Sequence, residues 1–259
     1  MRWLLLLSAF LSACAQLEVN TPNPRVEAPE VRGERYRWKV GAALLGTHVL
    51  KSTENGGARP PNFTEPDVHN GADVAAQVQF APLSRAEIGA ELYPMGRGAG
   101  MILRWQVIGE GSDSAGAGNF PLGVYIRAGR TSGTKSGDQK ETFGPGGYNW
   151  RGEIHNPFVH VGASLGYRPL DRMLIYMGAA GGRYWARSRI EQDAADGGAD
   201  PGGTYTDSLA GTGETYGVGL QWNWPALQIS AGLEFSRIDY EKAQAMEDSF
   251  IHAGLHFTP

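Results

Sequence analysis

The sequence predicts an all-β protein, an antiparallel up-and-down transmembrane β-barrel of ten strands, with eight strands as the alternative. Three observations predict this fold. From Tyr36 to Phe257, apolar residues alternate with polar or small residues at the period of a β-strand. The polar side of nearly every such segment carries charge or glycine, which suits the interior of a narrow barrel better than a dry sandwich core. The connections alternate between short and long, as they do in transmembrane barrels.

The composition excludes several other classes of protein. Glycine (37 residues) and proline (15 residues) make up about a fifth of the 259 residues, well above average usage. The single cysteine excludes an internal disulfide framework and paired-cysteine metal or redox motifs. A formal net charge of -4 gives no electrostatic case for nucleic acid binding. After the first dozen positions no run of about 20 apolar residues occurs, which excludes an internal membrane-spanning helix.

The alternation defines ten expected strands, at residues 36–44, 74–80, 87–93, 101–107, 120–126, 159–167, 173–189, 216–222, 227–235 and 251–257. Short connections at 81–84, 168–171 and 224–226 contrast with long polar ones at 51–70, 131–154 and 191–211. An even number of strands places both ends of the barrel domain beside the short turns. Two connections fit less well, because residues 93–100 are few for an outer loop and residues 109–119 many for an inner turn. Eight strands therefore remain the alternative.

Aromatic residues gather at two levels of the expected barrel. The level beside the short turns holds Trp38, Phe80, Tyr167, Trp222, Trp224 and Phe257. The level beside the long connections holds Tyr184, Trp185, Tyr216 and Phe250. Two aromatic girdles of this kind mark the two interfaces of a bilayer.

The amino terminus has the features of a secretory signal. One positive charge at Arg2 precedes an apolar run, and small residues follow at Ser12 and Ala13. The sequence Leu11-Ser12-Ala13-Cys14 resembles the lipobox of bacterial lipoproteins. The resemblance implies cleavage before Cys14, acylation of Cys14 and, because Ala15 follows, transfer to the outer membrane. Two or more acyl chains hold a protein on a membrane, whereas one chain is marginal.

Three regions follow from these features. Residues 1–13 are the expected lipoprotein signal peptide, and residues 36–259 are the expected barrel. Residues 14–35 are expected to be the lipidated cysteine and a flexible tether, because they contain three prolines and no aromatic residue.

The last strand, Ala253-Gly254-Leu255-His256-Phe257, resembles the closing strand of bacterial outer-membrane β-barrels. Strands of that family end on an aromatic residue that the assembly machinery reads. Here Thr258 and Pro259 follow the phenylalanine, which departs from the pattern. The resemblance covers residues 36–257 and implies an outer-membrane location.

Charged residues on the inward faces predict a polar network in the lumen. Glu87 and Glu91 should face Arg104 on the next strand, with Arg127 one strand further along. Charges removed from water must be paired, so a buried ion-pair network that plugs the lumen is favoured over a gated pore or an active site. The expected members are Arg37, Lys39, Glu87, Glu91, Arg104, Arg127 and Glu234.

The histidines do not predict a metal or a catalytic site. His252 and His256 share the inward side of one strand, but residues four apart in a strand lie about 13 Å apart. The chain is similar in strand count to ten-stranded barrel proteases, yet their acidic pairs and Asp–His dyad have no clear match. Barrel lipid A deacylases use a His-x-Ser order that residues 249–252 do not reproduce. We expect no cofactor and no metal, and the acidic loop 191–203 is read as solvated.

These observations lead to one functional hypothesis and two alternatives. The first is a lipid-anchored outer-membrane barrel with a largely plugged lumen and a structural or surface-interaction role. It implies contacts with outer-membrane lipid and with the barrel-assembly and lipoprotein-sorting machinery, an anchor on the periplasmic side and loops facing outside. It does not identify a surface partner. The alternatives are a narrow channel for ions or small solutes and a barrel enzyme acting on lipid or peptide.

Overall fold

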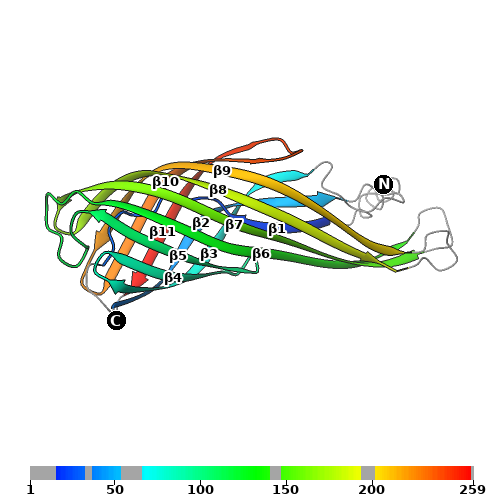
Figure 1. Ribbon diagram of the computed structural model, residues 1–259, viewed down its shortest axis with the longest axis horizontal. Helices are drawn as coiled ribbons and strands as arrows, with labels where there is room; N and C mark the ends of the chain where they lie inside the picture. Colours follow the sequence, from blue (N-terminus) through cyan, green and yellow to red (C-terminus); the bar gives the residue numbers. More distant parts are fainter. Residues whose placement is uncertain (1–15, 33–36, 54–65, 141–146, 194–201, 258–259) are drawn as a thin grey trace, which may run out of the picture.

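Eleven antiparallel strands form one sheet that closes into an elongated barrel in the computed structural model (Figure 1). The structure describes residues 16–32, 37–53, 66–140, 147–193 and 202–257. The strands are β1 (Gln16–Pro22), β2 (Arg37–Thr53), β3 (Asp67–Leu83), β4 (Ala86–Tyr93), β5 (Gly98–Ile108), β6 (Leu122–Lys140), β7 (Gly147–Leu170), β8 (Met173–Gln192), β9 (Gly203–Asn223), β10 (Leu227–Tyr240) and β11 (Met246–Phe257). Each strand from β2 to β11 pairs with the next, and β11 pairs with β2 to close the ring. The predicted ten-stranded up-and-down barrel is confirmed as β2–β11.

The strands form because their alternation gives each of them one apolar and one polar face. In β3, β4, β5, β9, β10 and β11 exposed and buried residues alternate almost without interruption. The exposed side is the apolar one, which is the reverse of a soluble protein and typical of a barrel surrounded by lipid. This outer band includes Val40, Val74, Val78, Ile88, Leu103, Ile126, Val161, Ile175, Met177, Val218, Leu220, Ile229, Leu233, Ile251 and Leu255.

The aromatic residues mark the two edges of this band with one exception. Trp38, Tyr167, Trp222, Trp224 and Phe257 are exposed beside the short turns, as expected. The Trp38 ring packs on Phe80 with 4.6 Å between centroids. At the other edge Trp185 and Tyr216 are exposed. Tyr184 was expected there too, but it is fully buried because neighbouring residues of a strand point to opposite faces.

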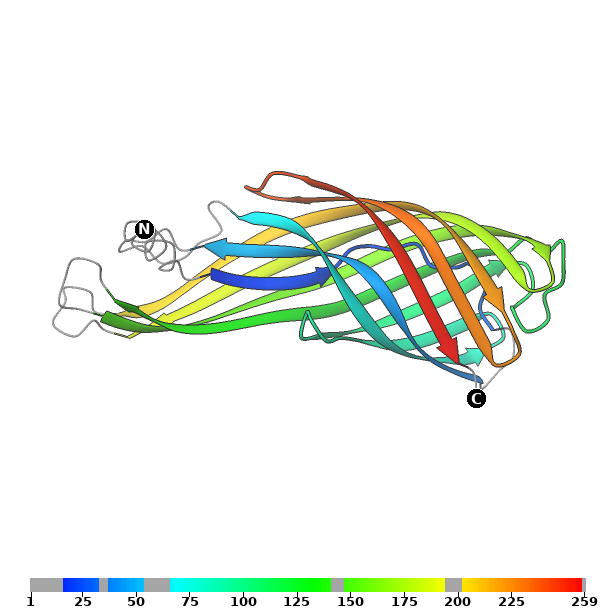
Figure 2. The same cartoon turned by 180° about the vertical axis from the view of Figure 1, so that it is seen from behind.

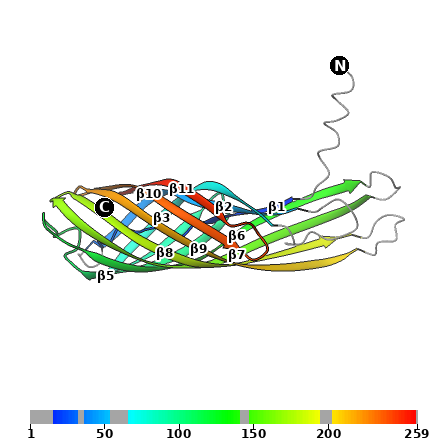
Figure 3. The ribbon, with the colours of Figure 1, turned by 90° about the horizontal axis from the view of Figure 1, so that it is seen from above.

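Two of the expected long loops consist mostly of strand. β6 and β7 pair from Leu122 to Lys140, and β8 and β9 pair from Met173 to Gln192, so residues 131–154 and 191–211 are largely hairpin. Glycine, serine and threonine made these ranges read as loops, but backbone pairing with a regular neighbour keeps them extended. β6–β9 therefore project beyond the other strands at one end of the barrel, which we call the long-loop end (Figure 3).

The opposite end, which we call the short-turn end, carries the tight connections at residues 84–85, 171–172 and 224–226. The fourth connection there, residues 109–121, is longer because it folds back over the barrel mouth. It turns at Gly109 and Gly118, whose φ angles of +88° and +86° favour glycine. At the long-loop end residues 94–97 make a four-residue turn. Both connections that fitted poorly are thus accommodated with ten strands.

The first strand, β1, was not predicted. It pairs antiparallel with β2 from Gln16 opposite Thr53 to Pro22 opposite Thr47. Because β2 runs from the short-turn end to the long-loop end, Gln16 lies at the long-loop end. The expected flexible tether on the short-turn side is therefore wrong for residues 16–32, which enter the barrel instead. In Figure 2, β1 and the coil after it run inside the ring of strands.

β1 takes a place that β11 leaves open. β11 pairs with β2 over only five residues, from Val40 to Leu44. Beyond that point the Asn23 amide donates a hydrogen bond to the Gly46 carbonyl at 3.1 Å, and β1 occupies the rest of the edge. Thr47 and His48 point to opposite faces of β2 and are both buried. The far half of β2, which stays paired with β3, is therefore covered on both faces.

We expect an engineered disulfide to form between Glu18→Cys and Lys51→Cys. These residues lie directly opposite each other, and facing residues of an antiparallel pair have Cα atoms about 4.5–5.5 Å apart, within reach of a disulfide. Mass spectrometry of non-reduced tryptic peptides would detect the bond. The control pair Glu18→Cys with Arg130→Cys should not link, because Arg130 is exposed on the outer face of β6. Equal linking of both pairs would contradict the β1 register.

Candidate functional site in the lumen

The expected polar network lies in the half of the lumen nearer the short turns. Six of its seven expected members are between 1% and 5% exposed, namely Lys39, Glu87, Glu91, Arg104, Arg127 and Glu234. Arg37 was expected to join them but is exposed, because it is the first residue of β2 and lies at the rim. Glu87 accepts a hydrogen bond from Arg104 at 2.7 Å, and Glu91 pairs with Arg127 at 2.8 Å.

Residues 23–32, which we call the luminal segment, complete this network. Arg25 lies 2.8 Å from Glu91 and 2.6 Å from Glu27. Glu27 also pairs with Arg127. Further along, both carboxylate oxygens of Glu30 accept hydrogen bonds from Arg168, at 2.6 and 2.5 Å. The side chains of the segment therefore pair with charges that three separate wall strands, β4, β6 and β7, bring inward.

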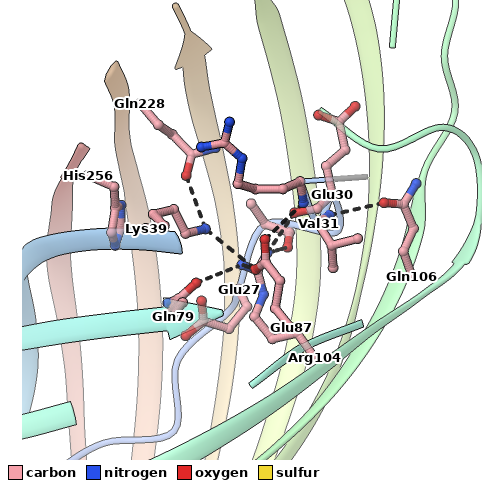
Figure 4. Close-up of polar contacts among 12 residues, drawn as sticks. Glu27, Glu30, Val31, Lys39, Gln79, Glu87, Arg104, Gln106, Gln228 and His256 are labelled. Carbon is pink, nitrogen blue, oxygen red and sulfur yellow. Dashed lines mark hydrogen bonds and ion pairs between the residues drawn. The ribbon is translucent and has the colours of Figure 1, made fainter. Parts of the chain in front are cut away.

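The wall also binds the main chain of the luminal segment (Figure 4). Arg104 donates to the carbonyl oxygens of Ala28 and Glu30 at 2.5 and 2.8 Å. In the other direction, wall side chains accept hydrogen bonds from segment amides: Val26 to Glu234 at 2.6 Å, Val31 to Gln106 at 3.0 Å and Arg32 to Glu87 at 2.8 Å. Thr215 donates to the Pro24 carbonyl at 2.7 Å. These contacts satisfy backbone groups that would otherwise be buried without partners.

The long inner turn holds the carboxyl end of the segment. Ser112 and Asp113 donate their amides to the carbonyls of Val31 and Arg32, at 2.7 and 2.9 Å. Arg32 also makes a two-pronged contact with the Asp113 carboxylate at 2.9 and 3.1 Å. The unusual length of residues 109–121 thus has a structural role, because it closes the short-turn end over the segment.

The charges in this network balance. Five cations, Arg25, Lys39, Arg104, Arg127 and Arg168, meet five carboxylates, Glu27, Glu30, Glu87, Glu91 and Glu234, and beside them Arg32 pairs with Asp113. Five of each leave no net charge to attract a mobile ion. A network of this kind costs desolvation energy and holds only while its partners stay together. Three of the ten groups, Arg25, Glu27 and Glu30, belong to the luminal segment, so the balance depends on the segment being in place.

The half of the lumen nearer the long loops is filled by apolar and aromatic side chains. Leu17 and Val19 of β1 pack there among buried residues of β2–β4 and β7–β11. His48 packs against Tyr184 and Tyr240, with ring centroids 4.7 and 5.5 Å apart. Its ring nitrogens lie 2.9 Å from the Asn23 amide oxygen and the Tyr240 hydroxyl. β1 is therefore a core element of this half.

Little space remains beside the segment. A polar cavity of about 40 Å³ lies between the luminal segment and β2, β10 and β11, bordered by Lys39, His252 and His256. One water needs at least about 10–15 Å³ of such space, so the cavity holds a few waters and not a solute of ordinary size.

The described residues offer no metal site, since no group of three or more histidine, cysteine or acidic residues converges among them. His252 lies 3.4 Å from Glu234, and both are buried. At the long-loop end His69 lies 2.6 Å from Asp67, and both are well exposed. Within the described part of the chain no serine, threonine or cysteine side chain bonds to His69, so this pair lacks a nucleophile.

Some expectations concern residues outside the described ranges. They are the signal peptide at 1–13, the lipidation site at Cys14 and most of the acidic loop between Asp193 and Gly202. Within the described residues, no helix is long and apolar enough to cross a membrane.

The fold defines the class of this protein: an up-and-down β-barrel with an apolar outer band, in which residues 16–32 contact the inward side chains of the wall. No protein-family model and no curated protein sequence matches the chain. Several solved structures are weakly similar to it, and they have low TM-scores.

Ail, the attachment invasion locus protein of Yersinia pestis, is 11% identical, with 87% of this chain and 100% of Ail covered and a TM-score of 0.31. The outer membrane protease OmpT from Escherichia coli is 9% identical, with 95% and 94% covered and a TM-score of 0.31. The outer membrane channel DcaP of Acinetobacter baumannii is 6% identical, with 95% and 96% covered and a TM-score of 0.19. At these scores, conclusions about function rest on the residues of this chain.

Proposed function

We propose that this chain is an outer-membrane barrel whose lumen is closed by its own amino-terminal segment and which acts through contacts made at the long-loop end. The lipobox resemblance at Cys14 adds a lipid anchor to this proposal. The observation that carries it is the buried luminal segment, whose charges and backbone groups are matched by the wall. A lumen that is neutral, dry at one half and nearly full at the other opposes conduction.

The outer-membrane location is supported by the alternating pattern and by the apolar band between aromatic girdles. The projecting strands β6–β9 supply the surface for contacts. Their outer faces beyond the band carry polar and charged residues, among them Arg187 and Arg189. Long loops of such barrels face outside, so this end is expected at the cell surface. The contact partner is not identified by these residues.

A conductance measurement distinguishes a closed barrel from a narrow channel. In planar bilayers the full chain should show no steady conductance, whereas a variant lacking residues 16–32 should conduct, because its lumen loses the side chains that fill it. A gel shift on heating would show that both proteins form closed barrels. The disulfide-locked variant Glu18→Cys/Lys51→Cys should stay silent. Steady conductance of the full and the locked chains would contradict the proposal and favour the channel.

A further inference from the structure

The direction in which the luminal segment runs has a consequence for the amino terminus. β1 begins at the long-loop end, where Gln16 pairs opposite Thr53, and it runs beside β6 and β7. The other end of the same segment is fixed at the short-turn end by the contacts of Val31 and Arg32 with residues 112–113. β1 and the luminal segment, residues 16–32 together, therefore cross the whole lumen, with Gln16 at the long-loop end.

The length of the segment agrees with a full crossing. Residues 16–32 can span at most about 55 Å when extended. The apolar band of an outer-membrane barrel is about 25 Å tall. The contacts are spread along the whole path, from Thr21 bonded to Thr131 at 2.8 Å, through Val26 on Glu234, to Arg32 on Glu87. The crossing is thus held at both ends and in the middle.

We propose that the barrel carries its own amino terminus through the outer membrane and displays it on the cell surface. This inference rests on the proposed function for one point, the orientation with the long loops outside. Residues 16–32 are held as an extended peptide whose polar and charged groups find partners on the inner face of the wall. The wall supplies acceptors for segment amides, donors for segment carbonyls and countercharges for Arg25, Glu27 and Glu30.

The threading also determines where a lipid on Cys14 would lie. Cys14 is two residues before Gln16, which is a reach of at most about 7 Å. The acyl chains that the lipobox resemblance implies for Cys14 are therefore expected in the leaflet at the long-loop end, not in the periplasmic leaflet that the sequence suggested.

Surface labelling of single introduced cysteines tests this inference. Glu18 is suitable because its side chain is 49% exposed, and the wild-type chain gives the background from Cys14. Ser208→Cys serves as the control at the long-loop end, and Ser84→Cys as the control in a short turn; both positions are exposed. A membrane-impermeant maleimide is applied to intact cells and then to cells with a permeabilised outer membrane.

The inference expects Glu18→Cys and Ser208→Cys to be labelled in intact cells, and Ser84→Cys only after permeabilisation. If Glu18→Cys behaves like Ser84→Cys while Ser208→Cys is labelled in intact cells, the threading is overturned and the proposed orientation stands. If Ser208→Cys also needs permeabilisation, the orientation fails and surface display is overturned with it. Retention of the gel shift on heating shows that each variant has folded.

Discussion

Replacing Arg127 with methionine should lower the free energy of unfolding by about 3–5 kcal/mol, the usual cost of removing one partner from a buried ion pair. The Arg127 side chain is buried between Glu27 and Glu91. Without it, both carboxylates remain inside the lumen with one fewer countercharge. Methionine has a similar length, so the loss reflects charge more than volume.

The matched control is Arg130→Met on the same strand. Arg130 is exposed, and no ion pair involves it within the described residues. Exposed substitutions of this kind usually change stability by less than about 0.5 kcal/mol. Urea unfolding in detergent, followed by tryptophan fluorescence, would measure both variants. Equal losses for Arg127→Met and Arg130→Met would show that the luminal network does not stabilise the barrel.

The second large effect is expected at Gly133, where β6 touches β1. A Cβ atom at this position would overlap the Glu18 carbonyl oxygen, which is backbone and cannot rotate away. Gly133→Ala should therefore push β1 out of its place and loosen the luminal segment. The segment contains Arg25 and Arg32, which are only 7% and 9% exposed in the intact protein.

Trypsin measures this loosening directly, because it cuts after arginine. We expect the intact protein to resist cleavage after Arg25 and Arg32. The Gly133→Ala variant should be cut about tenfold faster for each 1.4 kcal/mol by which binding of the luminal segment to the wall is weakened. Gly181→Ala is the control, since a Cβ there would come no closer than 3.8 Å to a neighbouring atom. Similar cleavage of the two alanine variants would argue against β1 as a fixed part of the lumen.

The predictions of strand position succeeded where the apolar face of a strand fixes which side points to lipid. Apolar residues such as Val74, Ile88 and Leu233 alternate with polar ones, and each strand then has only one way to face lipid. The same alternation places Glu87 and Arg104 on inward faces of neighbouring strands, where they meet at 2.7 Å. Ten strands and their order could therefore be predicted from local pattern.

The predictions failed where placement depends on distant partners. Residues 16–22 do alternate, with Leu17 and Val19 on one side and Glu18 on the other, but the neighbouring prolines favoured a tether. Arg25, Glu27 and Glu30 look like solvated charges in the sequence. They become buried because Glu91, Arg127 and Arg168, far along the chain, neutralise them.

The wall of the barrel is thus predictable from local sequence: the number of strands, their apolar outer band and the inward position of most charged residues. Those features follow from the alternation of apolar and polar residues, which can be recognised within the residues of each single strand. The burial of residues 16–32 against the wall, and the position of Gln16 at the long-loop end, are visible only in the tertiary structure. Both depend on the register of β1 on β2 and on ion pairs between residues more than sixty positions apart, which no local pattern contains.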